Sequence, residues 1–145
     1  MADAKPGVIQ FEGYRLIDAK FSCDSGFEFH ELKNGEFRYS FFKCHTAISE
    51  NEMQVNLRSR VFYSDNDDFD AAPYRVSIEI AGKFSSKTAF KKMWENNALA
   101  ILFPYVRSIV SCITAQSGRN AVILPTVNIA RMFEESEEDK SKLDR

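Results

Sequence analysis

The feature that most constrains this chain is an apolar segment from Asn96 to Gly118, NNALAILFPYVRSIVSCITAQSG. Its apolar side chains recur at steps of three and four residues, which predicts an α-helix. They cover one broad side of that helix and continue around a second, so that only a narrow polar strip is left. Pro104 is expected to kink the helix, and Gly118 to end it in a left-handed conformation.

A helix with so little polar surface is not expected to lie half in water. Arg107 and several serines interrupt the apolar run, so we expect it to be too short and too polar to cross a bilayer. Two interpretations remain open: a core helix covered by its own domain, or a helix that covers its own sheet on one side and a second subunit on the other. The side chains expected at such an interface are Leu99, Leu102, Tyr105, Val106, Ile109, Cys112 and Ile113.

Extended segments are predicted ahead of the helix, at residues 14–23, 36–48, 53–63 and 74–84. In the last two, apolar side chains alternate with polar ones, which is typical of half-buried strands. In the first, the alternation places Leu16 on the same face as Asp18. A short helix is expected over residues 87–94 and a last one from near Ile129. Strands followed by helices predict an α+β fold, with a four-stranded antiparallel sheet, a long helix packed on one face and a shorter C-terminal helix.

The length of 145 residues and the absence of repeats predict a single domain over residues 1–133. Residues 134–145 are mostly charged, and we expect a disordered acidic tail there. The net charge of −2, without any Lys/Arg-rich run, argues against binding of nucleic acid. The first residues show no secretory pattern, and the three cysteines have no CxxC spacing. A cytoplasmic protein with reduced thiols is therefore expected.

The titratable residues form no recognisable catalytic or metal-binding set. His30 and His45 have no partner at motif spacing, and Cys44, next to His45 on a strand, would point to the opposite face. The acidic stretch at residues 65–70 lacks the glycine and the closing glutamate of a calcium loop. No glycine-rich phosphate loop is present. We therefore predict no catalytic residue, no metal and no cofactor.

The chain has thirteen phenylalanines, many of them between residues 27 and 42. All of these rings could pack in the core. Alternatively, the alternating strands already fill the interior of so small a fold, and some rings line an exposed groove suited to apolar peptide segments. The residues by themselves leave both interpretations open.

Two motifs in the second half of the chain carry a specific resemblance. The string ILFPYVRS at residues 101–108 is followed by LPTVNI at residues 124–129. This pair, in this order, closely resembles the SecB family of bacterial export chaperones. Gly82-Lys83-Phe84 also matches the end of that family's fourth strand, and the resemblance extends from about Phe11 to Phe133.

The resemblance implies an ATP-independent chaperone that holds unfolded or precursor polypeptides, with protein export as the family's known use. It also implies a homotetramer, a dimer of dimers with the long helix between the two sheets, which would account for a helix that is apolar on two sides. Weak apolar contacts would add up along an extended client. The client groove implied by the family consists of Phe27, Phe29, Leu32, Phe37, Tyr39, Phe41, Ile129, Met132 and Phe133.

One face departs from the family pattern. Export members use an acidic sheet face to dock the basic tail of the SecA motor, and the corresponding positions here are Asp18, Ser22, Arg75 and Ser77. Only Asp18 keeps a carboxylate, and Arg75 adds the opposite charge, so this face would bind a cationic tail poorly. A SecB-like chaperone for one client such as an antitoxin, without SecA delivery, is therefore the alternative. A hotdog-like enzyme is remote, because the long helix has no Asp, Glu or His.

Overall fold

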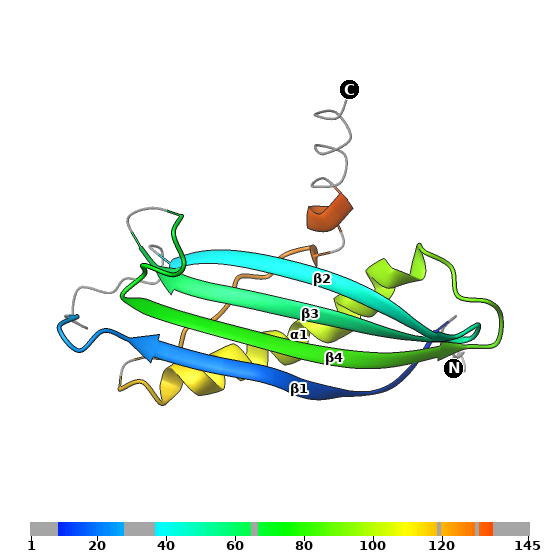
Figure 1. The fold of residues 1–145 in the computed structure, drawn as a ribbon, viewed down its shortest axis with the longest axis horizontal. Helices are drawn as coiled ribbons and strands as arrows, with labels where there is room; N and C mark the ends of the chain where they lie inside the picture. Colours follow the sequence, from blue (N-terminus) through cyan, green and yellow to red (C-terminus); the bar gives the residue numbers. More distant parts are fainter. Residues whose placement is uncertain (1–8, 28–36, 65–66, 119, 130, 135–145) are drawn as a thin grey trace, which may run out of the picture.

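The computed structural model describes residues 9–27, 37–64, 67–118, 120–129 and 131–134. Its elements are β1 (Ile9–Cys23), β2 (Phe37–Ser49), β3 (Glu52–Tyr63), β4 (Tyr74–Ser86) and α1 (Trp94–Ala115). The strands form one four-stranded antiparallel sheet in the order β1-β4-β3-β2, and α1 runs diagonally across one face of it (Figure 1). Residues 129 and 131–134 are helical as well. The predicted α+β architecture is confirmed.

The core lies between the sheet and α1, as the alternation in β3 and β4 predicts. Most of the inward-facing side chains of these strands are fully buried, and they form one core cluster with the buried side of the helix. Burying one such aliphatic side chain stabilises the fold by about 1.5–3 kcal/mol relative to leaving it in water. The side chains with no exposed area include Val55, Leu57, Val61, Val76, Ile78, Ile80, Leu99, Leu102, Val106 and Val110.

The short helix predicted over residues 87–94 is wrong. Trp94 is the first residue of α1, and the preceding residues form turns and irregular structure. The backbone N–H of Phe90 donates to the carbonyl of Glu50 at 3.1 Å, in the turn between β2 and β3. The Phe90 ring packs edge-on against Trp94, with centroids 5.3 Å apart. A tertiary hydrogen bond and a ring contact therefore replace the local helix that the apolar spacing suggested.

The segment after α1 returns along the polar strip of the helix. Arg107 Nε donates to the carbonyl of Leu124 at 2.9 Å, and Ser111 Oγ donates to the carbonyl of Val122 at 3.1 Å. Thr114 Oγ1, which is fully buried, accepts the N–H of Val122 at 2.7 Å. The narrow polar strip of the helix thus binds the backbone of the returning segment.

By length and composition alone, α1 could cross a membrane, since it has 22 residues and a window of mean hydropathy 1.7. The expectation that the segment is too short and too polar for a span is therefore not supported on those grounds. The helix continues through Pro104 as a single element. Its place in this fold follows instead from packing, because one side of it forms the core with β3 and β4.

The helix and the sheet lie in close contact at Gly82 of β4. A Cβ atom added at Gly82 would lie 2.6 Å from Cδ2 of Leu102 and 2.9 Å from Cε2 of Phe84. Leu102 and Phe84 have no exposed area, so neither side chain has free space to move into. Only a residue without a side chain fits this contact.

We expect Gly82→Ala to lower the free energy of unfolding by about 1–3 kcal/mol, because an added methyl group overpacks the interface between helix and sheet. Urea denaturation followed by circular dichroism measures this. Gly26→Ala is the matched control, since nothing lies within 4 Å of the added Cβ there. Equal stabilities for the two variants would contradict the close contact.

A buried carboxylate fixes the N-terminal end of α1 to β2. Glu95 is in the first turn of the helix, where the helix dipole favours a negative charge, and only 4% of it is exposed. Its two oxygens contact Nζ of Lys43 and Nδ1 of His45, both on β2. Because β2 is at the edge of the sheet, this cluster ties an edge strand to the core helix.

Glu95→Gln should destabilise the fold by about 1.5–3 kcal/mol, because it removes a charged acceptor from a half-buried lysine. Glu52→Gln is the control: Glu52 and Lys83 pair at 3.1 Å, but both side chains are exposed, and such pairs contribute about 0–1 kcal/mol. Denaturation midpoints of the two variants decide the question. A loss as small in Glu95→Gln as in the control would overturn this assignment.

Candidate functional site

Three of the four aromatic side chains of β2, those of Phe37, Tyr39 and Phe41, lie on the face of the sheet that α1 covers. Tyr39 pairs with Val61, and Phe41 pairs with Ser59, and both partners on β3 are fully buried. Since β2 is an edge strand, α1 does not cover these rings completely, and both stay half-buried. Burial raises the pKa of the Tyr39 phenol above its ordinary value.

Ring contacts hold this row of aromatics in place. The rings of Phe41 and Phe103 of α1 meet edge to face, with centroids 5.7 Å apart and planes at 71°. At the other end of the row, Phe27 contacts Tyr63, with ring centroids 5.4 Å apart. Phe37 contacts Tyr63 as well, at 6.1 Å. Such geometries are the preferred ones for aromatic pairs, so the exposed ring edges are held in fixed positions.

The last helical residues adjoin the same strand. Lys43 of β2 places Nζ 5.3 Å from the centre of the Phe133 ring, and Asn96 Nδ2 donates to Glu134 Oε1 at 2.7 Å. Met132, next to Phe133, is half-buried against the core. In Figure 1 this helical turn lies beyond the β2 edge of the sheet. It continues the apolar surface of β2 past Phe41.

Residues of the predicted client groove thus fall into three groups. Phe27, Tyr39, Phe41 and Met132 are half-buried, and we call these four the β2 apolar strip. Phe29 and Leu32 lie outside the described residues. The remaining three belong to the hydrophobic core: Phe37 (5% exposed), Ile129 (2%) and Phe133 (9%). Since so little of these three side chains is exposed, they offer little open surface, and their part in a client groove stays a prediction.

A cavity that the sequence did not predict opens at the end of β2 that contacts Glu95 of α1. Its volume is about 650 Å³, and it lies between the turn joining β2 to β3 and the segment before α1. Apolar and charged side chains share its wall, among them Met53, Phe90, His45 and Glu95. Its walls come from segments distant in sequence, so no local pattern could have revealed it.

The residues of the predicted subunit interface also differ in how deeply they are buried. Leu99, Leu102 and Val106 have no exposed area, since they pack on the chain's own sheet, and they are unavailable to a second subunit. Tyr105 and Cys112 are exposed, and Ile109 and Ile113 are half-buried. These four form the part of the interface prediction that a partner could reach.

Edge strand β1 adds exposed apolar side chains beside this flank of α1. The Tyr14 ring lies 4.5 Å from that of Tyr105, measured between centroids. Leu16, Ile17 and Phe21 are 50%, 48% and 39% exposed. This exposed apolar surface was not predicted, because a β-bulge between Leu16 and Asp18 changes which side chains share a face. Leu16 therefore pairs with inward-facing Ile80 and does not share a face with Asp18, contrary to the alternation.

Asp18, Ser22, Arg75 and Ser77 all lie on the outer face of the sheet, opposite α1. Ser22 pairs with Arg75 across β1 and β4, and Asp18 lies 3.9 Å from Lys20. Ser77 is only 8% exposed, so it offers little to a partner. The grouping agrees with the sequence prediction of a common face, while its use by a motor protein stays a prediction.

Nothing in the described part of the chain assembles a metal centre from three or more His, Cys, Asp or Glu side chains. Cys23, Cys44 and Cys112 are free thiols. Burial, followed by the neighbouring charge of Asp24, raises the pKa of Cys23. A raised pKa keeps a thiol protonated and weakens it as a nucleophile.

Comparisons with known proteins agree with the fold. Residues 24–140 match the family model described as preprotein translocase subunit SecB. The chain is 36% identical over 110 residues to the uncharacterized protein MJ0357 of Methanocaldococcus jannaschii, which covers 62% of this chain and 71% of the relative.

Solved structures share the fold at low sequence identity. The Mycobacterium tuberculosis Rv1957 SecB-like chaperone, in complex with a ChAD peptide from the Rv1956 HigA1 antitoxin, has a TM-score of 0.63 and 14% identity, covering 82% of this chain and 87% of that one. A protein of unknown function from Streptococcus agalactiae has a TM-score of 0.53 and 14% identity, covering 81% and 97%. Together with the family match over most of the sequence, these observations place the chain in the SecB family, a family of chaperones rather than enzymes.

Proposed function

We propose that the protein is an ATP-independent holdase that binds unfolded or precursor polypeptides on the β2 apolar strip. The observation that carries this proposal is the row of half-buried rings along an edge strand, held by Phe103 and Tyr63. Such a surface offers apolar area without polar groups that would select one sequence. Each side chain that a client buries there would contribute about 1 kcal/mol or somewhat more, and several contacts along one extended chain add up.

The assembly that we propose is a cytoplasmic homotetramer, a dimer of dimers. The exposed flank of α1 around Tyr105 and the exposed apolar residues of β1 support it, because apolar surface on this scale is typical of contact sites. The edge strand β1 also has one side without a neighbouring strand among the described residues. A second subunit would cover both features.

A chaperone dedicated to one client, without delivery to SecA, is the second candidate. The outer face favours it, because Arg75 and the nearly buried Ser77 stand where an acidic dock is expected. The structurally similar Rv1957 chaperone is in complex with a peptide from an antitoxin. A client of that kind would use the same β2 apolar strip, so the two candidates differ in client and not in mechanism.

Removing apolar area from the strip should weaken the holdase. We expect Phe41→Ser combined with Met132→Gln to need several-fold more protein to suppress aggregation of a chemically unfolded test protein, measured by light scattering without nucleotide. Phe42→Ser is the matched control, because Phe42 is the next residue of β2, is 47% exposed and pairs with Arg58 on the opposite face. Circular dichroism establishes that both variants are folded.

Equal loss of activity in the strip variant and the Phe42→Ser control would contradict a client site on the helix-covered face. A folded wild-type protein that leaves aggregation unchanged at molar excess would refute the holdase altogether.

The subunit interface is tested separately. Tyr105→Arg places a charge in the proposed contact and should reduce the mass measured by light scattering from a tetramer to a dimer or monomer. Met93→Arg is the control, since Met93 is 65% exposed and precedes the helix. An unchanged mass for Tyr105→Arg would show that this flank of α1 is not an interface.

A further inference from the structure

The outer face of the sheet is basic, although the whole chain has a net charge of −2. The cross-strand register places side chains from all four strands on this face, opposite α1. Its carboxylates are Asp18, Glu52 and Glu79, and Glu12 and Asp67 contact Ser85 and Arg38 at its margin. These carboxylates are outnumbered by the basic residues Arg15, Lys20, Arg38, Arg58, Arg60, Arg75 and Lys83.

The carboxylates of this face are already occupied. Glu79 accepts hydrogen bonds from Arg58 Nε at 3.1 Å and from Asn56 Nδ2 at 3.4 Å. Asp18 lies 3.9 Å from the ammonium group of Lys20. Glu52 pairs with Lys83 at 3.1 Å. Because these carboxylates already have partners, a smaller surplus of positive charge remains on the face, at Arg15 and Arg60.

Arg60, in the middle of the face, carries that surplus most clearly. Its guanidinium lies between two rings, 4.9 Å from the centroid of Phe42 and 4.7 Å from that of Phe69. Its Nε is buried without a hydrogen-bond partner, and no ion pair joins Arg60 or Arg15 to a carboxylate in the described ranges. The stacking fixes the guanidinium plane, so its donors are oriented before any partner arrives.

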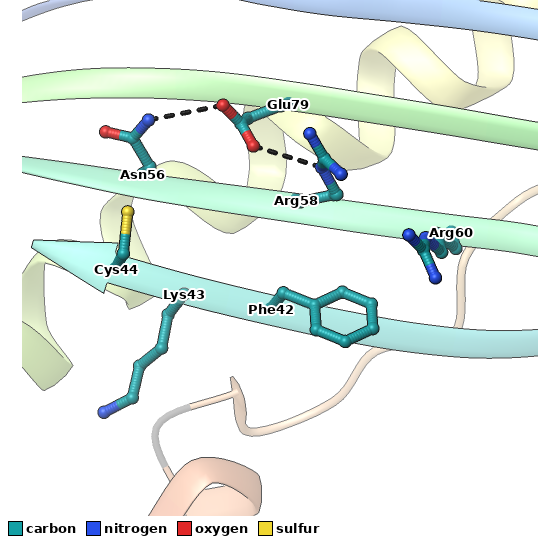
Figure 2. Close-up of a pocket in the computed structure, with 7 residues that line it drawn as sticks. All are labelled: Phe42, Lys43, Cys44, Asn56, Arg58, Arg60 and Glu79. Atoms are coloured by element: carbon teal, nitrogen blue, oxygen red, sulfur yellow. Dashed lines mark hydrogen bonds and ion pairs between the residues drawn. The ribbon is translucent and has the colours of Figure 1, made fainter.

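A cavity of about 330 Å³ opens beside this arginine. Figure 2 shows Arg60 and Phe42 next to each other on β3 and β2, with Arg58 turned to Glu79 and Lys43 pointing away. Phe42 is 47% exposed and forms an apolar wall next to the cationic one. The site therefore combines a preoriented cation, an exposed ring and space for a side chain.

We propose that this face docks an acidic segment of a partner polypeptide, with carboxylates on Arg60 and Arg15 and a neighbouring side chain beside Phe42. Guanidinium groups bind carboxylates through paired, charge-assisted hydrogen bonds, which suits a fixed arginine plane. Nucleic acid fits less well, because proteins that bind it commonly neutralise about 6–10 phosphates. Most of the cations here are already engaged with acidic or carbonyl groups.

This docking surface is separate from the β2 apolar strip, since Phe42 and Phe41 point to opposite faces of the same strand. A client and an acidic partner could therefore be bound at the same time. The proposal goes beyond the holdase function, and each could fail without the other.

The experiment titrates the full-length protein into a fluorescein-labelled peptide of alternating Glu and Ala and follows fluorescence anisotropy at low and high salt. Arg15→Gln combined with Arg60→Gln should weaken binding about three- to tenfold at low salt, with a smaller difference at high salt. Lys87→Gln combined with Lys92→Gln is the matched control. It removes the same charge from exposed positions between β4 and α1 and should leave binding unchanged.

Aggregation suppression is measured on the same variants, and the arginine variant should retain it. Equal binding by the arginine variant and the wild type, or an equal loss in the lysine control, would overturn the proposal. Tighter binding of a single-stranded oligonucleotide than of the acidic peptide, lost in the arginine variant, would also overturn it. A wild type that binds the peptide but does not suppress aggregation would refute the holdase and leave this docking surface standing.

Discussion

The close contact between helix and sheet at Gly82 is the constraint on which the rest of the structure depends. Because β4 has no side chain there, Leu102 reaches the backbone of the sheet, and α1 lies close enough to bury one whole side. The opposite polar strip then meets the returning segment through Arg107 and Thr114. That segment determines where the last helical turn lies, next to β2. Met132, the member of the β2 apolar strip that lies in this turn, therefore depends on the close packing at Gly82.

Much of the fold could be predicted because its signals are local. Alternation in β3 and β4 indicates which side chains face inward, and those side chains are buried. The β-bulge beside Leu16 could not be predicted, since one extra residue reverses the faces without leaving a pattern. The irregular segment before Trp94 also escaped prediction, because its backbone bonds to a distant turn. In each case a partner remote in sequence outweighed the local preference.

The sequence predicts which face of the sheet the side chains of the candidate site point to, but not how deeply each one is buried. Period-two alternation indicates that Phe37, Tyr39 and Phe41 share a face, but it does not tell how far the helix extends over each of them. Phe37 lies within the core, whereas Phe41 lies at its border. This difference in burial depends on the three-dimensional packing of α1 against β2. Arg60 between two rings was missed for a similar reason, since Phe69 belongs to a loop. The motif around Pro104 identified the family without locating either surface.

Strand β2 has a consequence for how such a protein can diversify. Neighbouring residues, Phe41 and Phe42, serve opposite faces, while Lys43 ties the strand to the helix through Glu95. Substitutions at every second position can therefore change one surface and leave the other intact. A deletion of one residue would exchange the two sets and withdraw the lysine from its carboxylate. Point substitutions in β2 can therefore change one surface at a time. An insertion or deletion within β2 would disrupt both surfaces together.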